Sequence, residues 1–241
     1  MADLVYPPVI ALARTMFRLL DMRITIEGEE HVPADGGAVI ACNHVSYLDF
    51  IFCGLGARRS KRLVRFMAKD SIFRHGIGGP LMRGMHHIPV DRDAGMASYK
   101  AALSALKAGE VVGVFPEATI SQSFTVKDLK SGAARLAAAT GTPLIPVVLW
   151  GTQRFWTKGH PRDLTQRGVA VTILIGEPLH PARRDNQDAV NAELRARMTT
   201  MLDRAQREYP QSPKGPDDAW WLPAHLGGSA PAPAVYEPEA Q

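Results

Sequence analysis

Short apolar runs alternate along this chain with longer segments whose apolar residues recur every three to four positions. A short continuous apolar run is typical of a buried strand, and the longer period is typical of a helix with one buried face. Strands are therefore predicted at residues 23–27, 37–42, 64–68, 88–90, 111–115, 143–150 and 169–175. Helices are predicted at 46–55, 96–106 and 131–140 and from 188 onward. This alternation predicts an α/β domain with a mixed, mostly parallel sheet flanked by helices.

Residues that typically end or cap helices lie at the ends of several of these elements. Gly109 and Gly141 follow two predicted helices, and Asp185 or Asn186 is placed to cap the last one. The glycine-rich segment 76–84 interrupts the pattern and predicts an irregular, flexible stretch.

An amphipathic helix is predicted within residues 1–22. Arg14 and Arg18 lie four residues apart on a different side from its apolar positions. Such a helix can lie in a membrane interface with its cations toward lipid head groups, or it can pack on the core of the domain, and the sequence leaves both open. The apolar positions are Val5, Val9, Leu12, Met16 and Leu19.

A histidine and an aspartate flank the start of the helix that follows the apolar run at 37–42. Side chains five apart on a regular helix diverge by about 140°, so His44 and Asp49 converge only if His44 precedes the helix. The Asp49 carboxylate can then hold one imidazole nitrogen and leave the other as a base. No Ser or Cys nucleophile stands beside the pair, because Cys42 lies on the strand. We interpret His44 as a base that activates a substrate hydroxyl.

Residues 43–49, Asn-His-Val-Ser-Tyr-Leu-Asp, resemble the NHxxxxD signature of the glycerolipid acyltransferases, the family of 1-acylglycerol-3-phosphate acyltransferase. Further blocks follow in the family's order at 88–92, 115–119 and 144–147, and segments 67–70 and 130–133 also fit. The similarity covers roughly residues 37–152.

The resemblance implies transfer of a fatty acyl chain from acyl-CoA or acyl carrier protein to the hydroxyl of 1-acylglycerol-3-phosphate, giving phosphatidic acid. It implies that His44 and Asp49 are catalytic, that Arg92 holds the acceptor phosphate, and that Glu117 and Thr119 shape the acceptor site. A guanidinium suits phosphate because its planar fork donates two hydrogen bonds at once. The resemblance implies neither a metal nor an organic cofactor.

The third block departs from the family pattern. The family usually has Glu-Gly-Thr-Arg where this chain has Glu-Ala-Thr-Ile at 117–120. Ala118 limits backbone freedom, and Ile120 removes a possible phosphate ligand. Either another cation such as Lys69 or Lys130 substitutes, or the acceptor head group differs.

Charge and composition narrow the possible partners. The net charge is +4, and residues 58–74 hold seven basic side chains against Asp70 alone, which favours an anionic membrane surface. A solvated basic face is the other interpretation. Nucleic acid is not expected, because no recognition-helix or zinc-ligand pattern is present. Cys42 and Cys53 offer no disulfide framework, and the chain has neither a signal peptide nor a 20-residue apolar run. We expect a peripheral protein on the cytoplasmic face of a membrane.

The last part of the chain differs in composition. Seven prolines lie between Pro210 and Pro238, which argues against packed structure there. Trp220 and Trp221 are the exception, and they can anchor the tail on the domain or enter a membrane interface. The predicted organisation is an interfacial helix at 1–22, an acyltransferase domain at 23–209 and a tail at 210–241.

Three alternatives stay open at this stage. The acceptor can be glycerol-3-phosphate or another lyso-lipid, and the chain can be a peripheral lipid-binding protein without turnover. A metal hydrolase is a weak alternative, because its residues lack a recognised metal spacing. Those residues are His44, Asp49, His86, His87 and Asp91.

Overall fold

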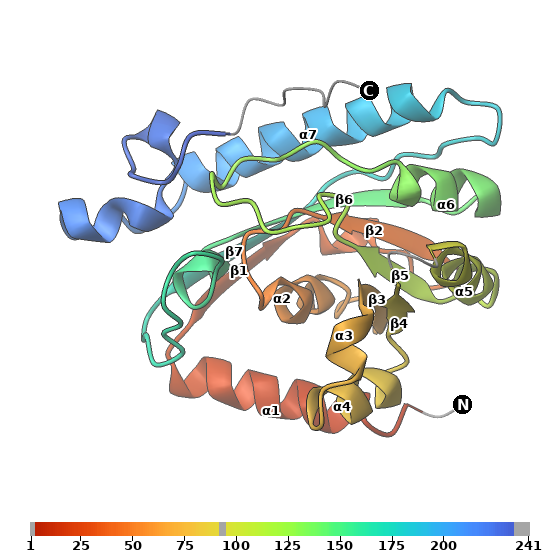
Figure 1. Cartoon of the computed structure of the whole chain (residues 1–241), viewed down its shortest axis with the longest axis horizontal. Coiled ribbons are helices and arrows are strands. Elements are labelled where there is room, and N and C mark those ends of the chain that lie inside the picture. Colours follow the sequence, from red (N-terminus) through yellow and green to blue (C-terminus); the bar gives the residue numbers. More distant parts are fainter. Residues whose placement is uncertain (1–2, 92–94, 234–241) are drawn as a thin grey trace.

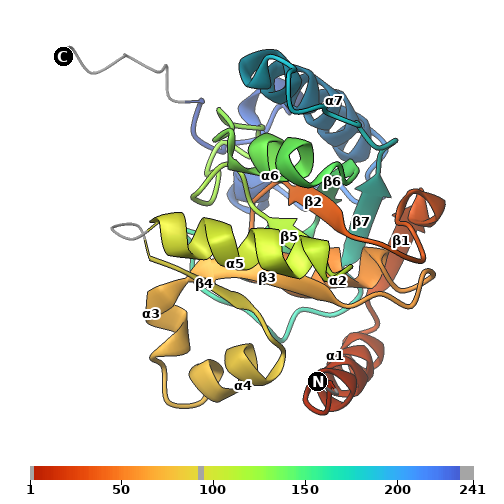
Figure 2. The same ribbon diagram turned by 90° about the vertical axis from the view of Figure 1, so that its right-hand side faces the viewer.

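One sheet runs through the molecule with helices on both of its faces (Figure 1 and Figure 2). The computed structural model describes residues 3–91 and 95–233. Within these residues the strands are β1 (Arg23–Glu27), β2 (Ala38–Cys42), β3 (Val64–Lys69), β4 (Ile88–Val90), β5 (Val111–Val114), β6 (Leu144–Trp150) and β7 (Ala170–Ile175).

The strand order is β1-β7-β6-β2-β5-β3-β4. Strands β2 to β6 are parallel, β7 is antiparallel to β6, and β1 is parallel to β7. The predicted mixed, mostly parallel sheet is therefore confirmed. Because β2, β5 and β6 are neighbours and parallel, their carboxyl ends meet at one edge, where open α/β sheets bind ligands.

Strand β2 is covered on both faces. Ala38, Ile40 and Cys42 belong to the core beneath α2, whereas Val39 and Ala41 belong to the core beneath α5, α6 and α7. Figure 2 shows α6 and α7 on one side of the sheet and α1 on the other. The helices are α1 (Tyr6–Leu19), α2 (Asp49–Gly56), α3 (Asp70–Phe73), α4 (Gly78–Gly84), α5 (Gly95–Lys107), α6 (Gly132–Thr140) and α7 (Gln187–Arg207).

Two helix predictions need correction. Helix α2 begins at Asp49 rather than Ser46, because the Ser46 hydroxyl accepts a hydrogen bond from the Leu48 N–H at 3.1 Å and holds a turn there. Most of the segment predicted to be irregular, 76–84, forms α4 instead. Pro80 is the third residue of α4, in the first turn, where its missing N–H costs no helical hydrogen bond.

The described part of the tail, residues 210–233, packs on the domain, contrary to the expectation from its proline content. The 3₁₀-helix η3 (Pro216–Trp221) brings Trp221 into the main core, where it is 1% exposed. The ring of Trp220 stacks on His160 at 4.2 Å. Of the two placements considered for these tryptophans, the structure shows anchoring on the domain.

Helix α1 divides its apolar residues between two environments. Tyr6 is buried and its hydroxyl donates to the Val64 carbonyl at 2.6 Å, and Val9 packs with it. Leu12 and Leu19 are 63% and 64% exposed. None of the helices in residues 3–91 and 95–233 is long and apolar enough to cross a membrane.

Candidate active site

The contact expected between His44 and Asp49 is present. His44 lies two residues beyond β2, and Asp49 is the first residue of α2. The Nδ1 atom of His44 lies 3.0 Å from Oδ2 of Asp49. A carboxylate in this position accepts the Nδ1–H bond and so favours the tautomer whose Nε2 is a base.

The Asp49 carboxylate is completely buried and is held by several donors. Its Oδ2 also accepts the N–H groups of Val45 at 2.8 Å and Ser46 at 2.7 Å, and its Oδ1 accepts the hydroxyl of Thr152 at 2.6 Å. Thr152 opens the 3₁₀-helix η2 (Thr152–Arg154) directly after β6. These bonds satisfy a buried anion with dipoles, and they fix the plane of the carboxylate.

The imidazole of His44 is partly open to solvent. Its side chain is 21% exposed, and one ring face stacks on Phe115 at 4.4 Å. Its Nε2 atom has no hydrogen-bond partner within the described part of the chain. This nitrogen is therefore available to a substrate.

Glu117 contacts the backbone of the same turn from the end of β5. Its Oε1 accepts the His44 N–H at 2.8 Å, and its Oε2 accepts the Lys127 N–H at 3.1 Å. Burial raises the pKa of the Glu117 carboxyl to about 7, and the two N–H donors oppose that rise. Glu117 thus joins the loop after β5 to the turn that carries His44.

Comparison with known proteins identifies the family of this chain. The model of the family described as Acyltransferase matches residues 23–150, more than half of the chain. The chain belongs to this acyltransferase family. It is 33% identical to the 1-acyl-sn-glycerol-3-phosphate acyltransferase of Bacillus subtilis, over 77% of this chain and 87% of that protein. It is 34% identical to the chloroplastic 1-acyl-sn-glycerol-3-phosphate acyltransferase LPAT1 of Arabidopsis thaliana, over 68% of this chain but only 45% of that longer protein.

A solved structure shares the fold of this acyltransferase. The crystal structure of the 1-acyl-sn-glycerophosphate acyltransferase PlsC from Thermotoga maritima superimposes with a TM-score of 0.70. The match covers 85% of this chain and 81% of that one, at 21% sequence identity. At that identity the likeness shows the fold alone.

Three of the residues expected to bind substrate in this acyltransferase, Lys69, Thr119 and Lys130, lie beyond or at the carboxyl ends of β3 and β5. Lys69 is the exposed last residue of β3, and Thr119 is exposed in the loop after β5. Lys130 is exposed, and its N–H donates to the Pro116 carbonyl at 2.9 Å. Arg92 lies outside the described residues. Their roles stay predictions.

The departure from the family's third block has a structural counterpart. Ala118 has a φ of +60°, the left-handed region that glycine adopts without strain. Ile120 is 6% exposed, so its side chain points into the protein. The loop after β5 therefore offers no cation at position 120 and holds a strained backbone at 118.

Two further residues of the site, Thr152 and Asn43, were not predicted to belong to it. Thr152 lies 103 positions beyond Asp49 and reaches it only because β6 pairs with β2. The Asn43 side chain bonds the backbone of Leu149, accepting its N–H at 2.7 Å and donating to its carbonyl at 3.1 Å. Asn43 was visible in the NHxxxxD motif, whereas a threonine after an apolar strand carries no distinctive sequence signal.

Two histidines of the metal-hydrolase alternative, His86 and His87, have partners other than His44 and Asp49. The buried His87 ring accepts the Phe66 N–H at Nδ1, and His86 lies 3.5 Å from the Asp3 carboxylate. Burial lowers the pKa of His87 to about 4. No group of three or more potential ligands is arranged for a metal among residues 3–91 and 95–233.

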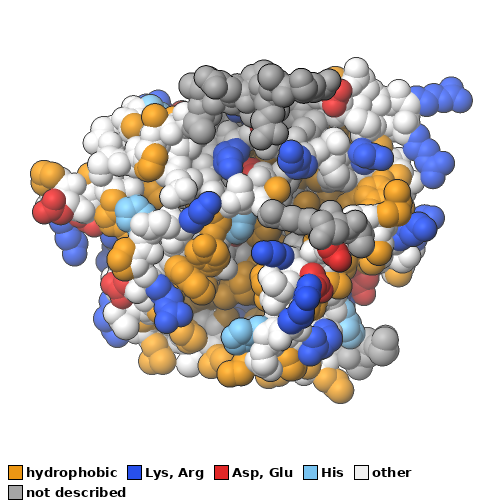
Figure 3. Space-filling view, viewed as in Figure 1, with side chains coloured by type: hydrophobic (Ala, Val, Ile, Leu, Met, Phe, Trp, Pro, Cys, Tyr) orange, Lys and Arg blue, Asp and Glu red, His pale blue; other side chains and the backbone are white. Residues whose placement is uncertain are grey.

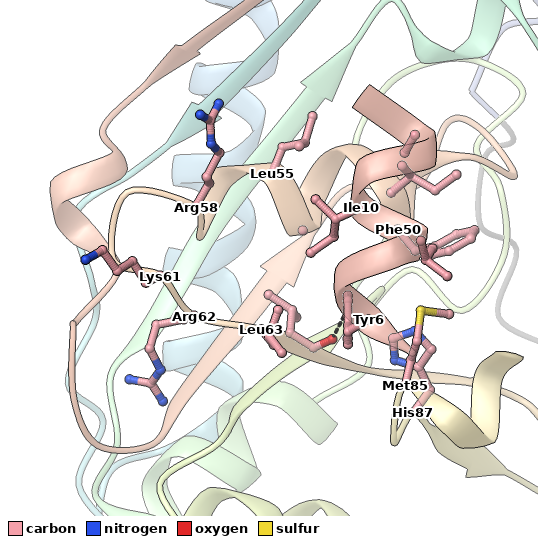
Figure 4. Close-up of a pocket in the computed structure, with 15 residues that line it drawn as sticks. Tyr6, Ile10, Phe50, Leu55, Arg58, Lys61, Arg62, Leu63, Met85 and His87 are labelled. Carbon is pink, nitrogen blue, oxygen red and sulfur yellow. Dashed lines mark hydrogen bonds between the residues drawn. The ribbon is translucent and has the colours of Figure 1, made fainter. Parts of the chain in front are cut away.

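An apolar cavity of about 180 Å³ lies between α1, α2 and the start of β3 (Figure 4). Ile10, Phe50 and Leu55 line it, and Arg58 and Lys61 stand at one end. The ring of Phe50 begins a series of aromatic contacts that leads to His44. The series runs from Phe50 to Phe66 at 6.2 Å, to Phe115 at 5.9 Å and to His44 at 4.4 Å.

The raised pKa of Glu117 predicts a pH dependence of stability. A carboxyl whose pKa rises from 4.5 to about 7 on folding stabilises the fold below pH 4.5, and that stabilisation is lost as the pH rises to 7. Glu117→Gln lacks this titration. The free energy of unfolding of the wild type, relative to the variant, should fall by on the order of 3 kcal/mol across that window. Urea denaturation of both proteins at several pH values measures it, and parallel pH profiles would contradict it.

Proposed function

We propose that this acyltransferase moves a fatty acyl group from a thioester donor to the free hydroxyl of 1-acylglycerol-3-phosphate, giving phosphatidic acid. The observation that carries the proposal is the buried Asp49 carboxylate on Nδ1 of His44, which leaves Nε2 open. The names of the relatives from Bacillus subtilis and Arabidopsis thaliana support the acceptor. The donor is acyl-CoA or acyl carrier protein.

The reaction follows from this geometry. Nε2 of His44 takes the proton of the acceptor hydroxyl as that oxygen attacks the thioester carbonyl. Asp49 stabilises the imidazolium that forms. The tetrahedral intermediate then collapses, the carbon–sulfur bond breaks, and His44 returns the proton to the departing thiolate. The products are an ester and a thiol.

The acceptor phosphate needs cations, and position 120 in the loop after β5 does not supply one. We assign this role to Arg92, with Lys69 at the end of β3 and Lys130 in the loop after β5 as further cations. Glu117 supports the site indirectly, because its carboxylate accepts the backbone N–H of His44. Thr119 is exposed and borders the acceptor site. Because Ile120 stands where the family has arginine, glycerol-3-phosphate and other lyso-lipids are the competing acceptors.

Removing the base should abolish transfer. Thiol release from palmitoyl-CoA or palmitoyl carrier protein, measured with and without 1-acylglycerol-3-phosphate, should require the acceptor. His44→Ala should lose about 10²-fold or more, the usual contribution of general-base catalysis, while its circular dichroism stays that of a folded protein. His225→Ala is the control, because that side chain is 44% exposed and lies on η4 (Ala224–Leu226).

Two results would count against the assignment. Turnover that persists without His44 would refute the mechanism. Activity with another lyso-lipid, but none with 1-acylglycerol-3-phosphate, would keep the mechanism and replace the acceptor.

The apolar cavity between α1 and α2 suits an acyl chain. It is lined almost wholly by hydrocarbon, and Phe50 connects it to the ring series that ends at His44. Arg58, Lys61 and Arg62 lie at the end away from Phe50, and we infer that this end limits the length of the chain accepted.

Filling the cavity should change chain-length preference. A Cβ at Gly54 would lie 3.8 Å from Phe66 and meet nothing nearer, so alanine fits while leucine intrudes into the space. Gly54→Leu should lower kcat/KM for palmitoyl donors more than for decanoyl donors, and Gly54→Ala should leave the ratio near that of the wild type. Equal losses for both donors in Gly54→Leu would contradict this placement of the chain.

A membrane-facing surface completes the proposal. We define the apolar rim as Leu12 and Leu19 of α1 with Ile77 and Leu81 of the α4 region, which are 63%, 64%, 75% and 40% exposed. In Figure 3 hydrophobic side chains gather along the lower edge, where Figure 1 shows α1 and α4. Exposed cations near this rim, including Arg18 and Arg58, suit anionic lipid. We place the protein peripherally on the cytoplasmic face of a membrane.

Charges introduced into the apolar rim should release the protein from membranes. Wild-type protein should float with vesicles of phosphatidylglycerol and phosphatidylcholine, and less in high salt. Leu12→Glu/Leu19→Glu should bind at least about tenfold more weakly, because two leucines lose their apolar burial. Met96→Glu is the control, since Met96 is 67% exposed on α5 away from the rim. Unchanged flotation of the double variant would refute this surface.

A further inference from the structure

We propose that Thr152 is a positioning residue of the active site, which holds the Asp49 carboxylate in the orientation that presents Oδ2 to His44. This inference rests on the proposed function for its catalytic meaning. Its structural basis is the bond of 2.6 Å between the Thr152 hydroxyl and Asp49 Oδ1, the shortest of the carboxylate's contacts. Thr152 and Asp49 are both 0% exposed.

The two carboxylate oxygens of Asp49 accept different numbers of hydrogen bonds. Oδ2 accepts three bonds, from the His44 ring and from the N–H groups of Val45 and Ser46. Oδ1 accepts one, from Thr152, within the described residues. A buried carboxylate oxygen without a donor is unfavourable, so the threonine hydroxyl satisfies an acceptor that no solvent reaches.

The direction of this bond is fixed by chemistry. An ionised carboxylate only accepts, so the Thr152 hydroxyl donates to Oδ1. With Oδ1 fixed, the carboxylate cannot rotate about its Cβ–Cγ bond without losing that donor. Oδ2 then stays on Nδ1 of His44, and the imidazole keeps the tautomer whose Nε2 is basic.

Thr152 is itself placed rigidly. Strand β6 pairs with β2 in parallel. Near the carboxyl end of β6, the Asn43 side chain makes two hydrogen bonds to the backbone of Leu149. Gly151 then turns the chain at a φ of +102°, where a Cβ would lie 2.2 Å from the Ala170 carbonyl oxygen. Only glycine fits this turn, and the turn delivers the hydroxyl to Asp49.

Loss of the hydroxyl should weaken the hydrogen bond between His44 and Asp49. Without that donor the carboxylate can rotate about its Cβ–Cγ bond, and Nδ1–H of His44 loses the fixed acceptor that favours the tautomer whose Nε2 is a base. The other titratable groups around the pair are Glu117 after β5, Cys42 on β2 and Cys53 on α2, with Lys127 beyond Glu117. Thr152→Val alters none of them.

The test compares threonine variants by NMR and by kinetics. In alkaline buffer, where an imidazole is neutral, the ¹⁵N chemical shifts of the His44 ring of the wild type should be those of the Nδ1–H tautomer. The signals are identified by their absence from the His44→Ala spectrum. In Thr152→Val they should move towards those of a mixture of the two neutral tautomers. The kcat should fall about tenfold or more with little change in KM, the size expected for a hydrogen bond to a charged group. Thr152→Ser keeps the hydroxyl and should restore both readouts.

Thr157→Val is the matched control. The Thr157 hydroxyl donates to the Val45 carbonyl at 2.7 Å in the same turn, but it does not touch Asp49. This variant should lose stability while the His44 ring keeps the tautomer of the wild type. A Thr152→Val protein whose His44 ring keeps the wild-type tautomer would overturn the proposal. Because the NMR measurement needs no turnover, that result is distinct from a failure of the proposed reaction, which would show as an inactive wild type.

Discussion

The buried Asp49 carboxylate is the constraint on which the site depends. An anion removed from water needs several donors, and here they come from two sources: the turn between β2 and α2, and the end of β6. The turn is irregular for this reason, since the Val45 and Ser46 amides point at the carboxylate instead of joining a helix. The strand order places β2 between β6 and β5, so Thr152 and Glu117 approach the same turn from opposite sides. A different strand order would leave the carboxylate without its threonine.

The parts of the fold that the sequence could predict are those set by local patterns. The strand at Arg23–Glu27 and the α6 helix before Gly141 follow from periodicity and end signals, and the capping of α7 by Asn186 does as well. The pairing of His44 with Asp49 was also local. Thr152 was not predictable, because its contact depends on the strand order. Helix α4 was not predicted, because its glycines are typical of an irregular segment. The position of Pro80 in the first turn, which a helix tolerates, is a weaker signal.

The loop after β5 explains how this chain differs from the family's usual pattern. Ala118 at a φ of +60° accepts strain that glycine would avoid, and Phe124 at +56° is buried against Trp150. Such strain persists only where surrounding contacts determine the backbone. Glu117 supplies two of them, and buried Ile120 adds packing. Buried contacts therefore determine the conformation of this loop. The side chain at position 120 points into the protein, so an arginine there would have to turn outward before it could bind a phosphate.

Helix α1 contributes residues both to the exposed apolar rim and to the apolar cavity. Its inner face, through Tyr6 and Ile10, lines the apolar cavity, while Leu12 and Leu19 lie exposed on its outer face. The N-terminal end is fixed by Asp3, whose carboxylate pairs with the buried Arg65 guanidinium at 2.7 Å and 2.9 Å. One helix thus forms both a wall of the cavity and part of the apolar rim. Through α1, the surface proposed to contact a membrane is therefore joined to the cavity proposed to hold the acyl chain.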